Sequence, residues 1–198
     1  MSQPFGHSLL SLKVQVPFWI CTLIWGTTWF VIRGQLGIVP PSWSVTYRFG
    51  VSALAMFAYA WLKGERLTLD RRQHRFVLLF GVAQFVFNFN FVYRAEAYIT
   101  SGLVAILFAL LIVPNTLLAR FFLGLRATKQ FYLGSSVAIA GIVLLFINEY
   151  RQGGGGDTVL LGIGLTLLGV LSASIANILQ ATPRAHEMPM ATMLAWGM

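Results

Sequence analysis

The hydrophobic and polar positions of this chain form long apolar runs that are separated by short polar or basic turns. Residues 76–93 and 102–122 are two such runs, and only the polar segment 94–101 lies between them. A helix needs about 20 mostly apolar residues to cross a bilayer, and each run is close to that length. Because the intervening segment is short, the pattern predicts two antiparallel helices that lie side by side in a membrane.

Four further runs have the length and composition of membrane spans, at 16–32, 43–62, 131–147 and 159–180. The first run is aromatic and is followed by Arg33 rather than by small residues, so we interpret it as a retained helix and not as a cleaved signal peptide. The sequence therefore predicts an all-α fold, a polytopic bundle of membrane helices.

The turns divide the chain into four parts. A polar lead-in covers residues 1–15, and five predicted spans cover 16–147. The segment 148–158 contains a run of glycines and has the composition of a flexible linker. Residues 159–198 hold a sixth span and end in an apolar stretch, 190–198, that is too short to cross a bilayer.

Composition supports a membrane protein. Hydrophobic residues make up 57% of the chain and charged residues 10%, whereas soluble domains contain about 25% charged residues. The net charge of +8 is a known signal for nucleic-acid binding, but here the basic residues lie in short turns between apolar runs. That distribution is typical of charges that orient a membrane protein, so we expect membrane lipid and no nucleic acid as partners.

The basic residues are divided unevenly between the two sets of turns. With the N-terminus in the cytoplasm, the outer set holds Arg33, Arg48, Arg94 and Arg151, and the inner set holds Lys13, Lys63, Arg66, Arg71, Arg72, Arg75, Arg120, Arg126, Lys129 and Arg184. Lysine and arginine favour the cytoplasmic side of short loops. The bias predicts a cytoplasmic N-terminus in a cell (inner or plasma) membrane.

The odd number of spans before the glycine-rich segment predicts an inverted repeat. Five crossings place the linker on the side opposite the N-terminus, and a second copy that starts there has the reverse orientation, as in many transporters. Only the beginning of a second copy follows, so we expect a truncated part of a longer protein. The alternative is a complete chain that ends in a short re-entrant or surface segment.

Four segments occur in a specific order between residues 17 and 146. They are Trp25-Gly26-Thr27-Thr28-Trp29-Phe30, Arg48-Phe49 after a proline-rich turn, the run from Ala95 to Leu107 that leads to Pro114, and Gly134 to Gly141. In these segments the chain resembles the EamA family of the drug/metabolite transporter superfamily. The resemblance implies one of two inverted five-helix repeats and the transport of small metabolites, amino-acid-like or other small solutes, by an exporter with alternating access.

One departure from the family concerns the turn after the fourth span. Members often have a glutamate there, whereas this chain reads Phe122-Leu123-Gly124-Leu125-Arg126. The second half of the family's architecture is also absent. The alternative function is therefore a non-transporting membrane subunit or a truncated remnant without its own transport path.

Polar and aromatic residues inside the predicted spans are candidates for substrate binding. They are Trp25, Thr28 and Trp29 in the first span, Arg48 in the second, Gln84 and Asn88 in the third, and Asn115 in the fourth. Amides cost free energy in hydrocarbon unless a partner satisfies them. Gln84 and Asn88 either line a cavity or join neighbouring helices, at roughly 1 kcal/mol or less per contact. The two tryptophans either line a cavity or lie at the membrane interface. Asn115, next to Pro114, belongs either to a hinge or binding notch or to a static kink.

Arg48 lies about 7–8 Å below the outer end of its helix, at 1.5 Å per residue. A charge at that depth is costly unless it snorkels or pairs. We expect Glu96, at the same level, to be its counter-ion. The pair either anchors two helices, or Arg48 attracts a carboxylate or phosphate of the substrate together with Arg94.

Small residues form a stripe on each of two predicted helices. One stripe contains Gly162, Thr166, Gly169, Ala173 and Ala176, and the other contains Gly134, Ala138 and Gly141. Small residues let helix backbones approach closely, so both stripes predict packing seams.

No pattern of catalytic or metal-binding residues occurs in the sequence. The acidic residues all lie outside the predicted spans, Cys21 has no second cysteine, and His7, His74 and His186 are far apart. We therefore expect no enzymatic activity, no cofactor and no metal. We expect a small-molecule substrate, and either a homodimer or a missing second half as the protein partner.

Overall fold

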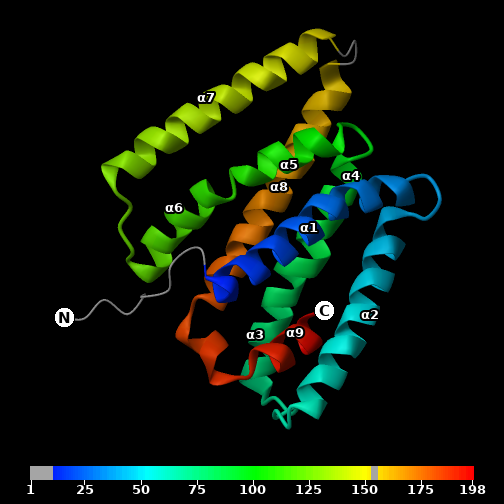
Figure 1. Cartoon of the computed structure of the whole chain (residues 1–198), viewed down its shortest axis with the longest axis vertical. Coiled ribbons are helices and arrows are strands. Elements are labelled where there is room, and N and C mark those ends of the chain that lie inside the picture. The colour runs from blue at the N-terminus through cyan, green and yellow to red at the C-terminus, as the bar shows by residue number, and fades with distance from the viewer. Residues whose placement is uncertain (1–10, 153–155) are drawn as a thin grey trace.

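The computed structural model describes residues 11–152 and 156–198, which form an all-helical chain without strands (Figure 1). The elements are α1 (Leu12–Gln35), α2 (Pro41–Leu62), α3 (Arg71–Gly81), η1 (Val82–Asn88), α4 (Phe89–Ala95), α5 (Ser101–Ala109), α6 (Ile112–Leu123), α7 (Lys129–Gln152), α8 (Gly156–Gln180), η2 (Pro183–Glu187) and α9 (Met190–Gly197). Most of the predicted lead-in and the centre of the predicted linker lie outside the described residues.

Each predicted apolar run is helical in the structure. In the described part, five helical stretches are long and apolar enough to span a membrane: Leu12–Gln35, Arg71–Ala95, Ser101–Leu123, Lys129–Asn148 and Gly156–Gln180. The predicted second span is the helix α2 but is not among them, and it carries Arg48 together with several hydroxyl side chains. α7 continues to Gln152 and α8 begins at Gly156, so much of the predicted linker is helical.

The third span is one continuous stack of α3, η1 and α4. It starts at Asp70, whose carboxylate accepts hydrogen bonds from the backbone N–H groups of Arg72 and Gln73, while the Gln73 side chain accepts from the Asp70 N–H. This reciprocal cap fixes the helix start. Its middle, η1, is a π-helix, and such wide turns occur frequently at functional sites.

The fourth span is interrupted between α5 and α6 at Leu110 and Leu111. Pro114 causes the break, because a proline has no N–H and its ring clashes with the carbonyl four residues earlier, here that of Leu110. The Val113 N–H donates a hydrogen bond of 2.9 Å to the Leu110 carbonyl, three residues earlier, as in a 3-10 turn. The predicted single helix over 102–122 is therefore two shorter helices.

α8 is the central helix and packs against η1, α4, α5 and α6. All five members of its small-residue stripe are buried, which confirms that stripe as a packing seam. The stripe on α7 differs, because nothing described lies within 4 Å of a side chain built at Gly134 or Gly141, and Ala138 is exposed. The seam predicted on α7 is therefore not present in the structure.

Replacing Gly169 with leucine is expected to destabilise the protein. A Cβ atom at Gly169 would lie 3.4 Å from the Asn88 carbonyl oxygen, so the larger branched side chain has no room against η1. Overpacking of this kind costs about 1–3 kcal/mol or more. The melting temperature in detergent measures the loss, and Gly134→Leu, at an open position, is the matched control. Equal loss in both variants would contradict the seam.

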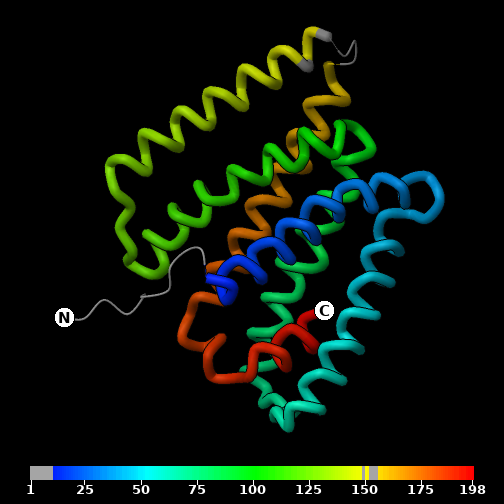
Figure 2. The backbone as a smooth tube through the Cα atoms, in the orientation of Figure 1, coloured from blue at the N-terminus to red at the C-terminus, as the bar shows by residue number. Residues whose placement is uncertain are grey.

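The C-terminal stretch forms α9, which packs between α2 and α3 (Figure 2). Two hydrogen bonds fix it to the α2–α3 turn: Thr192 Oγ1 donates to the Arg66 carbonyl at 2.9 Å, and Trp196 Nε1 donates to the Leu67 carbonyl at 2.8 Å. At the opposite end of the molecule lie the α1–α2 turn and the α4–α5 corner, which build the candidate site (Figure 1).

Candidate functional site

A cavity of about 590 Å³ lies between α1, α2 and α4. Its lining is partly apolar, and its polar side chains are Thr27, Thr28 and Gln35 from α1, Ser44, Tyr47 and Arg48 from α2, and Tyr93 from α4. Two of the seven predicted binding residues, Thr28 and Arg48, meet here. A mostly apolar pocket with a few placed polar groups is the usual form of a small-molecule site.

Arg48 carries the only charge among the lining residues of this cavity. Its guanidinium carbon lies 5.2 Å from the ring centroid of Phe89 and 5.7 Å from that of Phe49, so both rings make cation–π contacts. No described acid forms an ion pair with it. The rings orient the guanidinium without neutralising it, which leaves its planar donors available to a carboxylate or phosphate.

The polar link at the edge of this cavity joins α1 to α4. Tyr93, which is almost fully buried, donates from its hydroxyl to Gln35 Oε1 at 3.1 Å. The hydroxyls of Thr27 and Thr28 each donate to a backbone carbonyl one turn earlier at 2.7 Å, so their oxygens remain as acceptors. The cavity therefore offers a cationic donor from α2 and neutral polar groups from α1 and α4.

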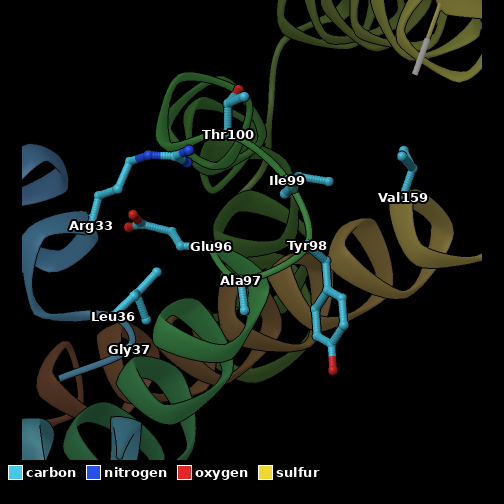
Figure 3. Close-up of a pocket in the computed structure, with 9 residues that line it drawn as sticks. All are labelled: Arg33, Leu36, Gly37, Glu96, Ala97, Tyr98, Ile99, Thr100 and Val159. Carbon is cyan, nitrogen blue, oxygen red and sulfur yellow. The ribbon is translucent and has the colours of Figure 1, made fainter. Parts of the chain in front are cut away.

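The predicted contact between Arg48 and Glu96 is wrong. Glu96 lies instead in a second cavity of about 460 Å³ at the α4–α5 corner, where Arg33 is the facing cation (Figure 3). Its Oε2 accepts a hydrogen bond from Ser101 Oγ at 2.6 Å. Arg48 and Glu96 have the same predicted depth, but α1, not α2, places its arginine on the Glu96 side of the bundle.

Burial raises the pKa of the Glu96 carboxyl to about 7, because the charged form loses water, while the Ser101 hydrogen bond and the Arg33 charge act in the opposite direction. The corner itself is tight: the Tyr98 and Ile99 N–H groups both bond to the Ala95 carbonyl. This turn folds the Glu96 side chain back into the protein.

The two predicted tryptophans lie on α1 and face away from the Arg48 cavity lining. Trp29 packs on Phe108 of α5 with ring centroids 5.5 Å apart, and Trp25 lies 6.5 Å from Trp29 and is 52% exposed. Neither residue lines a described cavity. Trp29 therefore attaches α1 to α5.

Gln84 and Asn88 lie in η1, and Asn88 lies against Gly169 of α8. Asn88 is only 3% exposed, and its Oδ1 and the Gln84 Oε1 have no hydrogen-bond partner among the described residues. Ser172 of α8 donates to the Ala83 carbonyl of the same π-helix at 2.8 Å. This buried polar contact is separate from the Arg48 cavity.

Asn115 joins α6 to α8. Its Oδ1 accepts hydrogen bonds from Ser174 Oγ at 2.6 Å and from Asn177 Nδ2 at 3.4 Å. Hydrogen bonds between membrane helices stabilise packing by roughly 1 kcal/mol each. The seven predicted residues therefore do not form one site. Sequence reasoning missed Gln35 and Tyr93, because their hydrogen bond depends on α1 and α4 being neighbours in the fold.

Comparison with known proteins shows a match between this sequence and a family of transporters. The EamA-like transporter family matches residues 17–147. Protein PagO of Salmonella typhimurium is 28% identical over 70% of this chain and 45% of its own length. YedA of Escherichia coli K12, an uncharacterized inner membrane transporter, is 26% identical over 72% of this chain and 46% of its own length.

An uncharacterized transporter of Buchnera aphidicola is 24% identical over 66% of this chain and 43% of its own length. The chain thus spans less than half the length of these curated relatives. No solved structure matches the chain. With the family match covering most of the described helices, the chain belongs to the EamA-like transporter family and is a multi-pass membrane protein.

Proposed function

We propose that this chain forms the substrate-recognising part of a carrier that exports small solutes bearing a carboxylate or another anionic group. The observation that carries the proposal is the Arg48 guanidinium, which lies in a cavity between three helices without a described acidic partner. A charged side chain that faces a cavity within a membrane helix bundle is by default a candidate functional residue. Membership of the EamA-like transporter family and the similarity to YedA support the same conclusion.

Alternating access requires one wall of the cavity to move, and α1 is suited to that role. Ile32 is its only buried residue among those the structure describes, so few contacts hold the helix against the bundle. α1 nevertheless supplies Thr27, Thr28 and Gln35 to the cavity. A movement of α1 therefore changes access to Arg48 without unpacking α8.

The working carrier contains more surface than this chain provides. Its relatives are more than twice as long as the region they share with it, so a second half or a second copy supplies the opposing wall. We place the carrier in the inner membrane with its N-terminus in the cytoplasm, on the basic-residue bias and the name of the YedA relative.

Reconstituted vesicles provide the test. The chain is inserted in liposomes at a density that lets two copies pair and supply both walls of the carrier. The liposomes contain labelled small carboxylates, such as amino acids and hydroxy acids, and efflux is compared with that of the corresponding neutral amides. We expect efflux of the carboxylates above that from protein-free liposomes, and little efflux of the amides. Equal efflux of both classes would contradict anion recognition.

The alternative is a non-transporting membrane subunit, which the coverage of less than half of each relative favours. Its signature in the same experiment is carboxylate binding without efflux. Binding to the purified chain, measured by a carboxylate-dependent rise in melting temperature, distinguishes this outcome from a protein that does not recognise the solute.

A further inference from the structure

The α4–α5 corner contains a buried carboxyl group that the proposed substrate cavity does not use. Glu96 lies on the short connection between two spanning helices, yet it is only 3% exposed. Its Oε2 is bound by Ser101 Oγ at 2.6 Å, and its Oε1 is buried without a described hydrogen-bond partner. An ionised carboxylate accepts about four hydrogen bonds in water, so a single bond leaves the charged form poorly solvated.

The groups around Glu96 supply one opposing charge. Among the described lining residues of its cavity, the charged or titratable side chains besides Glu96 are Arg33 from α1 and Tyr98 from the corner itself. The corner contributes the hydroxyl of Thr100, α5 contributes that of Ser101, and α8 contributes the apolar Val159. On α4, Arg94 donates from Nη2 to Ser42 Oγ of α2.

Arg33 and Glu96 extend into the same space from different elements, as Figure 3 shows. Arg33 itself is exposed at the end of α1, so water solvates its charge and weakens the attraction between the two groups. The effect of burial on the Glu96 pKa is therefore larger than the opposing effects of Ser101 and Arg33. The resulting pKa of about 7 leaves both protonation forms populated at neutral pH.

The charge on Glu96 matters for α1 because few other contacts hold that helix. The C-terminal end of α1 is attached by the buried Ile32, by the Trp29–Phe108 ring contact, and by the hydrogen bond from Tyr93 to Gln35. Attraction between Arg33 and an ionised Glu96 adds a fourth attachment. Protonation makes Glu96 neutral and so removes its attraction to Arg33.

We propose that Glu96 is a proton-binding site, and that a proton bound there releases the C-terminal end of α1 from the α4–α5 corner. The proton comes from water in the cavity, forms an O–H bond with the carboxylate, and returns to water when α1 closes, so no other reactant takes part. Because α1 also lines the Arg48 cavity, proton binding and access to Arg48 are linked. The consequence for transport rests on the proposed function; the proton site does not.

Difference infrared spectroscopy of the purified full chain tests proton binding directly. We expect a carbonyl stretching band of a protonated carboxylic acid that disappears with a midpoint near pH 7. The band is expected to be absent in Glu96→Gln and retained in Glu187→Gln, which removes an exposed acid at the other end of the molecule. A midpoint near 4.5, the ordinary value for glutamate, would overturn the proton site.

Spin labels test the movement of α1. In a Cys21→Ser background, labels at Ile38→Cys, just after α1, and Gly102→Cys, in the first turn of α5, report the distance across the corner. We expect this distance to increase as the pH falls through neutral. Glu96→Gln is expected to show the long distance at every pH, because its side chain is always neutral.

Arg33→Gln provides a second variant, in which the long distance is again expected at every pH while the infrared band of Glu96 persists. The pH midpoint at which this band disappears is expected to be higher than in the original protein, because the Arg33 charge lowers the Glu96 pKa. A label distance that is constant across the titration in the unsubstituted corner would overturn the link to α1. Neither measurement uses a substrate, so a failed efflux assay leaves both results standing.

Discussion

Replacing Arg48 with glutamine is expected to reduce efflux of carboxylate solutes by about 10- to 100-fold. The substitution removes the only charge among the described residues that line the α1–α2–α4 cavity. Hydrogen bonds to a charged group contribute roughly 1.5–3 kcal/mol, and each 1.4 kcal/mol is a factor of about ten in affinity. Initial efflux rates over a range of internal solute concentrations measure the loss.

Two control variants separate the role of this arginine from a general loss of positive charge. Arg48→Lys keeps the charge but not the planar pair of donors, so intermediate efflux is expected. Arg126→Gln removes an exposed arginine from the turn before α7 and is expected to leave efflux unchanged. Full efflux by a folded Arg48→Gln protein would show that the solute does not bind at this cavity.

The sequence was sufficient to predict the helices because lipid imposes a simple rule on them. A span needs enough consecutive apolar residues, and no lipid-exposed backbone group is left without a hydrogen bond, so run length alone locates the elements. The interior of a run carries less information. The π-helix η1 and the break at Leu110 both lie within runs that read as continuous helices, although Pro114 is a local signal for the second.

Pairings between helices were harder to predict than the helices themselves. Arg48 and Glu96 have the same predicted depth in the membrane, and this shared depth is the only basis in the sequence for pairing them. Rotation of each helix about its axis decides which side chains meet, and packing against α8 and α5 sets that rotation. The contact that Glu96 does make, with Ser101 five residues later, is local and is therefore the kind of contact that sequence reasoning can find.

The two small-residue stripes also show that a sequence pattern does not identify which helices meet. On α8 the stripe has described neighbours: Gly169 lies against the Asn88 carbonyl, and Gly162 lies against Ile99 of the α4–α5 corner. On α7 an equivalent pattern faces no described residue. Small residues permit close approach between helices, but the pattern does not specify a partner.

Replacing Gly81 with alanine is expected to destabilise the protein by about 1–3 kcal/mol, the usual range for overpacking. A Cβ atom at this position would overlap the carbonyl oxygen of Gly197, where α9 crosses α3. The conflicting atom belongs to the backbone, so no side-chain rotation relieves the clash. Relief requires α9 to move, which exposes the fully buried Met193 and strains the bond from Trp196 to Leu67.

Unfolding in mixed detergent micelles measures this loss, and Gly164→Ala is the matched control. Gly164 lies within α8, and no described atom lies within 4 Å of a Cβ built there. Alanine is a better helix former than glycine by about 0.5–1 kcal/mol, so this variant is expected to be slightly more stable than the original protein. If Gly81→Ala gained stability to the same extent, α9 would not pack against α3 in the membrane protein, and the two hydrogen bonds to the α2–α3 turn would be lost with it.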